Sequence, residues 1–130
     1  MDAEDLASET ILKVLLNAEK FDVSRSFRLW VLVIMRNTFR SRSRNRGVVE
    51  SFDKLPEDVH GSDPSAYAIV NECMSVVNEC VKSSIGARSA LLYAQGYSYN
   101  EIADMQGVTV NIVKSRVHHG RKLIYRKLSG

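Results

Sequence analysis

Residues 98–117 read SYNEIADMQGVTVNIVKSRV, and this stretch decides the fold of the chain. Ser98 and Glu101 have the spacing of a capping box, which predicts the start of a helix. Gly107 then ends that helix with a turn, and Thr109 caps a second, longer helix. Two capped helices joined by a glycine turn are typical of a helix-turn-helix, in which the second helix enters the major groove of DNA. The alternative is an ordinary helical hairpin with a basic exterior.

The second of these helices has a predicted inner face and a predicted outer face. Val113 and Val117 face inward, and Leu123 or Ile124 continues that face. On the outer face, Lys114 can meet a guanine or a phosphate and Asn111 can pair with adenine. Other basic side chains are better placed for phosphate, which positions a helix without reading sequence. The candidate DNA contacts are Thr109, Asn111, Lys114, Ser115, Arg116, His118, His119 and Arg121.

Charge is distributed unevenly along the 130 residues, although the net charge is only +3. Seven arginines and no acid lie between residues 23 and 49, and six Lys or Arg and no acid lie between residue 105 and the end. The first 22 residues hold six acids against two lysines. This asymmetry predicts two surfaces that face polyanions and one acidic surface with a different partner.

The first basic block lies on a predicted helix over residues 25–44, with Ser24 as its N-cap. One face of this helix is apolar and carries Phe27, Trp30, Val31, Ile34 and Thr38. Arg36, Arg40 and Arg44 are spaced four apart, so their like charges repel on an isolated helix. Bound phosphates would neutralise this stripe, and the alternative is a plain solvated face. Trp30 is interpreted as a core residue rather than a base-stacking one.

The acidic N-terminus is predicted to form a helix over residues 3–19. Its apolar residues follow the i, i+3, i+4 pattern and are Ala3, Leu6, Ala7, Ile11, Val14, Leu15 and Ala18. Asp2, Asp5 and Glu9 fall on the opposite side. These acids either complement the helix dipole or bind a partner.

The middle of the chain reads as a linker followed by two helices. Residues 46–64 contain Gly, Pro and most of the remaining acids. Pro64 is the predicted first residue of a helix over 64–82, and another helix is predicted over 86–95. No pattern indicates a β-strand. The sequence therefore predicts an all-α protein with two small helical units joined by an acidic linker, the second unit being a four-helix helix-turn-helix domain.

Several functional classes are excluded by what the sequence lacks. No apolar run approaches the ~20 residues that span a bilayer, and the N-terminus is acidic where a signal peptide is basic, so we expect a cytoplasmic protein. Cys73 and Cys80 are interpreted as reduced core thiols. No residues have metal-ligand spacing, and no glycine loop, triad or carboxylate pair indicates an enzyme. We expect no cofactor.

The whole chain resembles the extracytoplasmic-function group of bacterial sigma factors. The resemblance lies in the acidic stretch 2–10, in Phe27-Arg28-Leu29-Trp30 with residues 34–38, and in residues 98–128, of which Val113-Lys114-Ser115-Arg116-Val117 is the most specific match. It implies a sigma region 2 over 1–46, a linker over 47–63 and a sigma region 4 over 64–130. The family normally has two further helices before the acidic one, so the resemblance predicts that the first helices are missing here.

The resemblance also implies partners and site residues. The implied partners are core RNA polymerase, promoter DNA and an anti-sigma factor, and the implied function is transcription initiation. Polymerase binding falls on Asp2, Glu4, Asp5 and Glu9. Contact with the −10 element falls on Arg28, Arg36, Asn37, Arg40 and Arg44, and contact with the −35 element falls on the helix-turn-helix residues named above.

Two narrower questions stay open at the level of sequence. Residues 36–39 and 96–99 resemble the alphaproteobacterial general-stress subgroup, which implies a role in stress response. A sigma-like decoy that captures an anti-sigma factor without binding promoters is the main alternative function. An ordinary dimeric helix-turn-helix repressor would explain residues 98–128 but not the arginine-rich helix.

Overall fold

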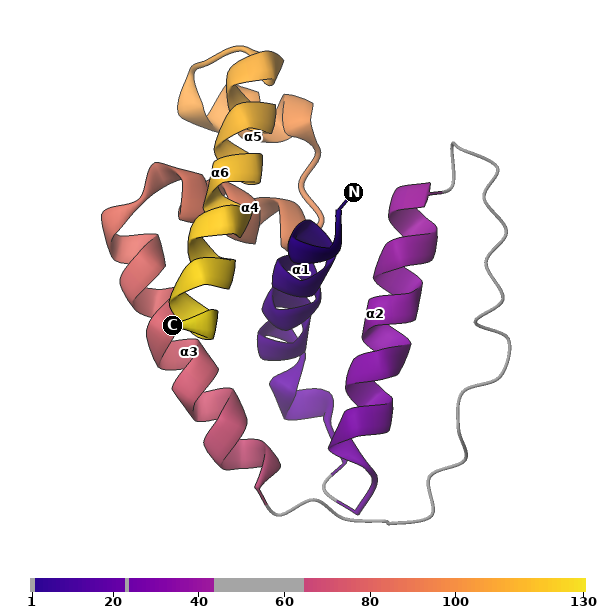
Figure 1. The fold of residues 1–130 in the computed structure, drawn as a ribbon. Helices are drawn as coiled ribbons and strands as arrows, with labels where there is room; N and C mark the ends of the chain where they lie inside the picture. The colour runs from indigo at the N-terminus through magenta and orange to yellow at the C-terminus, as the bar shows by residue number, and fades with distance from the viewer. Residues whose placement is uncertain (1, 23, 44–64) are drawn as a thin grey trace.

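The computed structural model describes residues 2–22, 24–43 and 65–130, and every element within these ranges is helical (Figure 1). The predicted all-α class is therefore confirmed. Arg44, Pro64 and the predicted linker lie outside the described residues. The elements are α1 (Ala3–Leu16), the 3-10 helix η1 (Ala18–Lys20), α2 (Phe27–Ser43), α3 (Ala66–Ser83), α4 (Ile85–Ala94), α5 (Tyr99–Gln106) and α6 (Val110–Ser129).

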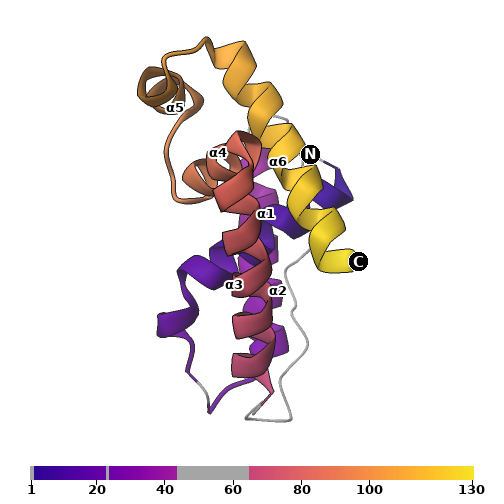
Figure 2. The ribbon, with the colours of Figure 1, turned by 90° about the vertical axis from the view of Figure 1, so that its left-hand side faces the viewer.

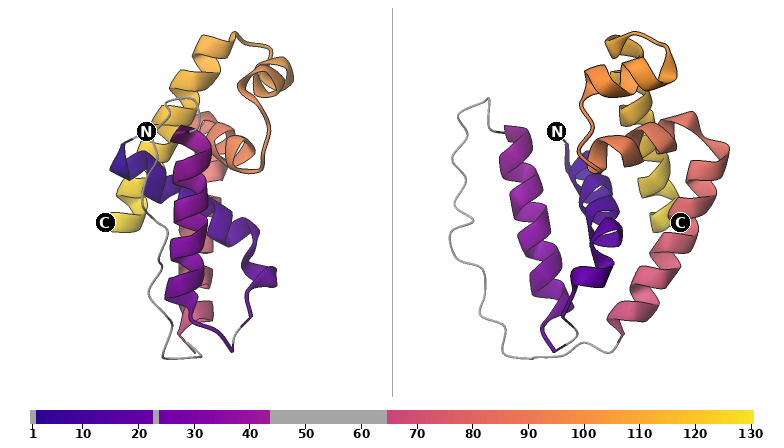
Figure 3. Two further views of the ribbon diagram at one scale, coloured as in Figure 1. Left: turned by 90° about the vertical axis from the view of Figure 1, so that its right-hand side faces the viewer. Right: turned by 180° about the vertical axis from the view of Figure 1, so that it is seen from behind.

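The N-terminal helix α1 occupies the middle of the molecule. It packs against α2 on one side and against α6, α4 and α3 on the other (Figures 1 and 3). Figure 2 shows α5 and the start of α6 at one end, beyond the other helices. The two predicted helical units are thus in direct contact, and most of that contact is made by α1.

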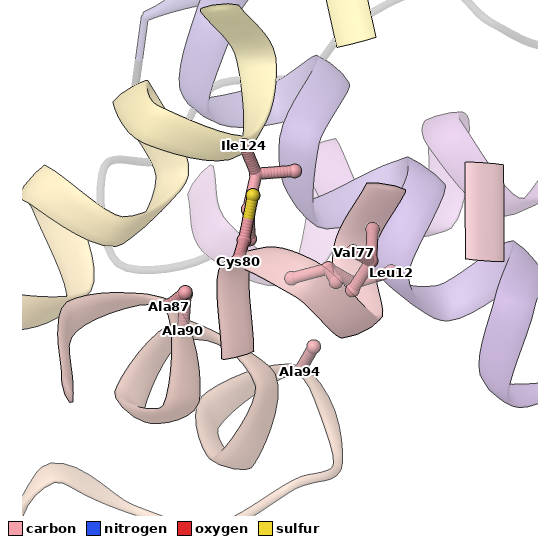
Figure 4. Close-up of a cluster of buried hydrophobic side chains, with 7 residues drawn as sticks. All are labelled: Leu12, Val77, Cys80, Ala87, Ala90, Ala94 and Ile124. Carbon is pink, nitrogen blue, oxygen red and sulfur yellow. The ribbon is translucent and has the colours of Figure 1, made fainter. Parts of the chain in front are cut away.

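The main core gathers side chains from α1, α3, α4 and α6 (Figure 4). Leu12 and Ile124 are its largest fully buried members, and each contributes about 1.5–3 kcal/mol by leaving water. The cluster comprises Leu12, Val77, Cys80, Ala87, Ala90, Ala94 and Ile124. Leu12 was absent from the predicted apolar face of the first helix, because that pattern assumed one buried face and α1 is covered on several sides.

Local capping explains where the first two helices begin. The Asp2 side chain accepts a hydrogen bond from the backbone N–H of Asp5, with 2.8 Å between the atoms, and so caps α1. The predicted cap Ser24 is wrong, because its backbone N–H and hydroxyl both donate to the Asp22 carboxylate instead. Ser26 replaces it: its Oγ accepts from the backbone N–H of Leu29, and α2 starts at Phe27 rather than residue 25.

Helices α3 and α4 differ from their predicted bounds by one or two residues. The Ser84 side chain accepts a hydrogen bond from the backbone N–H of Ala87, and α4 therefore starts at Ile85. In α3, the side chain of Ile69 is 46% exposed. Cys80 is buried and Cys73 is half-buried, and both are free thiols whose pKa is raised by burial.

The helix-turn-helix has the predicted local geometry. Ser98 and Glu101 form both bonds of the capping box. Gly107 adopts a left-handed conformation with φ of 66°, and the Thr109 side chain caps α6. Beneath them lies a second buried cluster of Ile102, Ala103, Val113 and Val117. Of the two predicted continuations, Ile124 is fully buried and Leu123 is half-buried.

Helices α4 and α6 cross at two glycines. A Cβ on Gly120 would lie 2.0 Å from the carbonyl oxygen of Gly86, and a Cβ on Gly86 would lie 2.9 Å from the carbonyl oxygen of Arg116. Only glycine allows backbones to approach this closely. This crossing fixes how the long helix α6 lies on the rest of the fold. Among the described helices, none is long and apolar enough to cross a membrane.

Candidate nucleic-acid interface

The first half of α6 presents a polar surface above a buried one. Val113 and Val117 are at most 1% exposed, whereas Asn111 before them and Lys114 and Ser115 between them are exposed. The buried valines pack against Ile102 and Ala103 of α5, and these three polar side chains lie on the opposite, exposed side of α6. Thr109, His118 and His119 are exposed on the same helix or its cap, and this half of α6 carries no acid. This polar surface is what a base-reading helix needs.

Lys114 and His118 each lie close to another side chain, an aromatic ring for Lys114 and a carboxylate for His118. The Lys114 ammonium lies 5.7 Å from the centre of the Tyr99 ring, at the distance of a weak cation–π contact. The His118 Nδ1 lies 3.6 Å from a carboxylate oxygen of Asp5 in α1. The contact of Lys114 is therefore with α5 of the helix-turn-helix. His118 instead lies at the edge of the contact between α6 and α1.

Arg116 is not a free phosphate ligand in this structure. Its Nη1 donates to the Gln106 side chain at 2.8 Å, and Gln106 in turn donates to the hydroxyl of the buried Ser89 at 2.8 Å. Ser89 then donates to the carbonyl of Ile85. The chain of bonds connects α6, α5 and α4. Arg116 therefore helps to position α6 against α5, a role that its place in the sequence did not indicate.

Arg121 was predicted to contact phosphate but is only 7% exposed. Its guanidinium donates to the carboxylate of Glu9 in α1, with 2.9 Å between Nη2 and Oε2. Arg121 is buried because α6 packs against α1 at this point, and its side chain lies between the two helices. In this conformation Arg121 serves an internal contact.

The arginines of α2 divide into exposed and internal groups. Arg28, Asn37 and Arg40 are exposed, and Arg36 is half-buried. Arg42, which no sequence pattern singled out, donates to the Glu9 carboxylate and, through Nη1, to the hydroxyl of Tyr93 at 2.9 Å. The predicted stripe is therefore only partly presented to solvent by the residues described.

A cavity of about 510 Å³ lies where the chain enters α2. Its walls include the rings of Phe21 and Trp30, whose centres are 5.1 Å apart, together with the basic residues Lys20 and Arg25 and the acid Asp22, which lies 3.7 Å from Arg25. Trp30 is only half-buried, so it is less enclosed than its interpretation as a core residue implied. Aromatic faces next to positive charges form a surface that suits an unstacked base.

The four acids predicted to bind polymerase, one at the N-cap of α1 and three within it, fall into an exposed pair and a buried pair. Asp2 and Glu4 are exposed, whereas Asp5 is 7% and Glu9 1% exposed. The predicted outward position of Asp5 and Glu9 is wrong for this structure, because α6 covers that side of α1. The hydrogen bond from Lys122 holds the pKa of the Asp2 carboxyl below its ordinary value.

Two tyrosines extend the buried polar network around Glu9. The rings of Tyr93 and Tyr99 stack in parallel with centres 4.4 Å apart, and the Arg42 guanidinium lies 4.0 Å above the Tyr93 ring. Burial, followed by a hydrogen bond with Tyr93, raises the pKa of Tyr99 to about 12. Both phenols therefore belong to the inner packing of the helix-turn-helix. In residues 2–22, 24–43 and 65–130, no three His, Cys, Asp or Glu side chains are grouped to hold a metal ion.

Two family models match this chain. The model of Sigma-70 region 2 matches residues 1–48, which include α1, η1 and α2. The model of Sigma-70, region 4 matches residues 88–124, which include α5 and the exposed half of α6. The candidate contacts thus lie within the two matched segments.

Named relatives show the same likeness. The chain is 32% identical to the ECF RNA polymerase sigma factor EcfG of Rhodopseudomonas palustris, over 92% of this chain and 67% of that protein. It is 30% identical to the ECF RNA polymerase sigma factor SigE of Mycolicibacterium smegmatis over 93% of this chain but 49% of the relative, so it spans about half the length of SigE. Among solved structures, the sigma factor RpoE, co-crystallised with the anti-sigma factor NepR from Bartonella quintana, is 24% identical with a TM-score of 0.34, covering 98% of this chain and 81% of that one.

Proposed function

This chain belongs to the family of extracytoplasmic-function (ECF) RNA polymerase sigma factors, and we propose that it acts as a promoter-specificity subunit of RNA polymerase. In this function it binds core polymerase, reads promoter DNA and has no catalytic chemistry of its own. The observation that carries the proposal is the first half of α6, where exposed Asn111, Lys114 and Ser115 stand above the buried Val113 and Val117.

The upstream, −35 element is the proposed target of α6. Asn111 and Lys114 have the chemistry to read base edges, and Ser115 can bond to either a base or a phosphate. Thr109, His118 and His119 flank them and are exposed as well. Arg116 supports this surface from within the protein through Gln106.

The downstream, −10 element is the proposed target of α2 and of the cavity at its start. Arg28, Asn37 and Arg40 are exposed and can follow a single-stranded backbone. A base that leaves the stack needs an aromatic face and polar neighbours, and Trp30 with Arg25 supplies both at the cavity wall. Arg36 completes the proposed set from its half-buried position.

Core polymerase is the proposed partner of the acidic residues of α1, namely Asp2, Glu4, Asp5 and Glu9. An anti-sigma factor, implied by the family resemblance, is kept as a further proposed partner. Core polymerase works in the cytoplasm, so the proposal puts this chain there too. Membership of the general-stress subgroup, and with it a role in stress response, stays a prediction.

Transcription in vitro tests this function directly. Purified chain and core polymerase are incubated with a library of genomic promoter fragments, and open complexes are mapped by permanganate reactivity of unpaired thymines. We expect promoter-specific opening that depends on the added chain. In a parallel salt titration of DNA binding, log K should fall linearly with log salt by ~0.9 per phosphate neutralised. A decoy would open no promoter and bind no DNA, and that result would overturn the proposal.

A further inference from the structure

Three acids at the start of α1 surround one lysine of α6. The Lys122 ammonium lies 2.6 Å from the carboxylate of Asp2, 3.3 Å from that of Glu4 and 3.8 Å from that of Asp5. The hydrogen bond with Asp2 raises the pKa of Lys122. These contacts lie at the accessible rim of the interface, because Asp2 and Glu4 are both exposed.

Inside this rim, the contact between α1 and α6 is buried and specific. Glu9 receives the guanidinium of Arg121 and is 1% exposed. Beside it, the hydroxyl of Ser8 donates to the backbone carbonyl of Arg121 at 2.7 Å, and Ser8 is also fully buried. Buried polar partners that satisfy one another define one arrangement of two helices, whereas apolar contact alone tolerates sliding.

Both sides of this contact include residues that have another proposed task. The acids of α1 are the proposed polymerase-binding residues, and Arg121 and His118 belong to the candidate DNA surface. A carboxylate that is bound to Arg121 or Lys122 is not available to polymerase, and the two cations are not available to phosphate. The two functions therefore compete with the internal contact.

We propose that this contact, formed by Asp2, Glu4, Glu9, Arg121 and Lys122, is an internal latch that holds the free chain in a closed, inactive form. The occupant of the acidic surface of α1 is the chain's own α6. Core polymerase displaces α6 from α1, and the displacement releases the cations of α6 to DNA. The inference rests on the proposed function, because the latch regulates those two binding surfaces.

The latch links the two binding events thermodynamically. A partner that binds only the open form shifts the population toward that form. Its apparent affinity for the free chain is its affinity for the open form multiplied by the fraction of chains that are open. Because linkage is reciprocal, polymerase bound at α1 strengthens DNA binding at α6, and DNA strengthens polymerase binding by the same factor.

Carbodiimide cross-linking of the unmodified chain tests the closed form. The reagent joins a carboxylate to an amine in direct contact, so the 2.6 Å pair predicts an amide between Lys122 and Asp2, or Glu4 beside it. Mass spectrometry should find this link in monomers and not between isotopically distinct copies. Added core polymerase should suppress it. Absence of the intramolecular link, or an unchanged yield with polymerase bound, would overturn the latch.

A charge-matched pair of variants tests the effect on DNA. Asp2→Asn with Glu4→Gln removes the two nearer of the three carboxylates around Lys122 and keeps a side chain that can cap α1. Glu19→Gln with Glu72→Gln removes the same charge at exposed positions on η1 and α3. With a short fluorescein-labelled DNA duplex of mixed sequence, we expect the latch variant to bind about fivefold more tightly than the control. Equal affinities would overturn the latch.

The two measurements separate failure of the latch from failure of the proposed function. A chain that binds the duplex without forming the cross-link overturns the latch alone. A chain that forms the cross-link but binds no duplex in any variant overturns the proposed function, and the regulatory role falls with it.

Discussion

The Arg121 guanidinium of α6 donates to the Glu9 carboxylate of α1, across a separation of 112 residues in the sequence. The same carboxylate accepts hydrogen bonds from Arg42 of α2. One buried anion therefore joins helices from both family-matched segments of the chain. Removing one member of such a group leaves the others charged and without their partner in a poorly hydrated place.

Glu9→Gln is predicted to destabilise the fold. The amide keeps the shape of the side chain but loses the charge that two guanidiniums share, so we expect the free energy of unfolding to fall by about 3 kcal/mol. Urea denaturation followed by circular dichroism measures this loss. Glu19→Gln removes the same charge from an exposed position and should stay within about 0.5 kcal/mol of the unchanged chain. Equal stability of the two variants would contradict the central role of Glu9.

The features that could be predicted from the sequence are those determined by neighbours in the chain. The capping box of Ser98, the left-handed Gly107 and the cap Thr109 each depend on residues within a few positions, and all three are confirmed. The buried Val113 and Val117 follow from helical periodicity for the same reason. The caps, the turn and the buried face of the helix-turn-helix could therefore be predicted from the local sequence.

The features that could not be predicted depend on which helices meet. The sequence assigned Glu9 to an outward face because its own helix is amphipathic, and nothing in α1 indicates that α6 covers that face. Arg42 is one of several closely spaced arginines, and no local pattern distinguishes it as the one that binds Glu9. The crossing of Gly86 and Gly120 joins helices that are far apart in sequence, and a glycine within a helix carries no local sign of its partner.

Gly120→Ala is predicted to disrupt the crossing of α4 and α6. The new methyl group would lie 2.0 Å from the carbonyl oxygen of Gly86, so the two backbones must separate. We expect the free energy of unfolding, measured by heat or urea, to fall by about 3 kcal/mol or more. Gly86→Ala meets backbone at 2.9 Å and should cost less. Ser129→Ala, at the exposed end of α6, is the control and should change stability little. Equal effects at all three positions would contradict the close crossing.

Stability should decrease at high pH because of Tyr99. Its folded-state pKa is about 12 against an ordinary value of 10.0, so the folded chain favours the neutral phenol. The stabilisation is complete below pH 10 and is lost as the pH rises towards 12. Phenylalanine cannot ionise. Between pH 9 and pH 11, the free energy of unfolding measured with urea should therefore fall by about 1 kcal/mol less in Tyr99→Phe than in the unchanged chain. Tyr97→Phe is the matched control at a 40% exposed position and should behave like the unchanged chain. An identical pH profile for Tyr99→Phe and Tyr97→Phe would contradict the prediction.

DNA binding should distinguish a phosphate contact from a positioning contact within α6. Lys114 is exposed, and Lys114→Ala should lower the slope of log K against log salt by about one. Arg116 donates to Gln106, so Arg116→Ala should weaken binding without changing that slope. Gln106→Ala should weaken binding similarly, and it should add little in the Arg116→Ala background because the two residues belong to one chain of hydrogen bonds. Arg126→Ala removes the same charge at the far end of α6 and controls for net charge. If the slope falls by one for Arg116→Ala, this guanidinium leaves Gln106 and binds a phosphate. The hydrogen bonds that connect Arg116 through Gln106 to the buried Ser89 would then not set the position of α6.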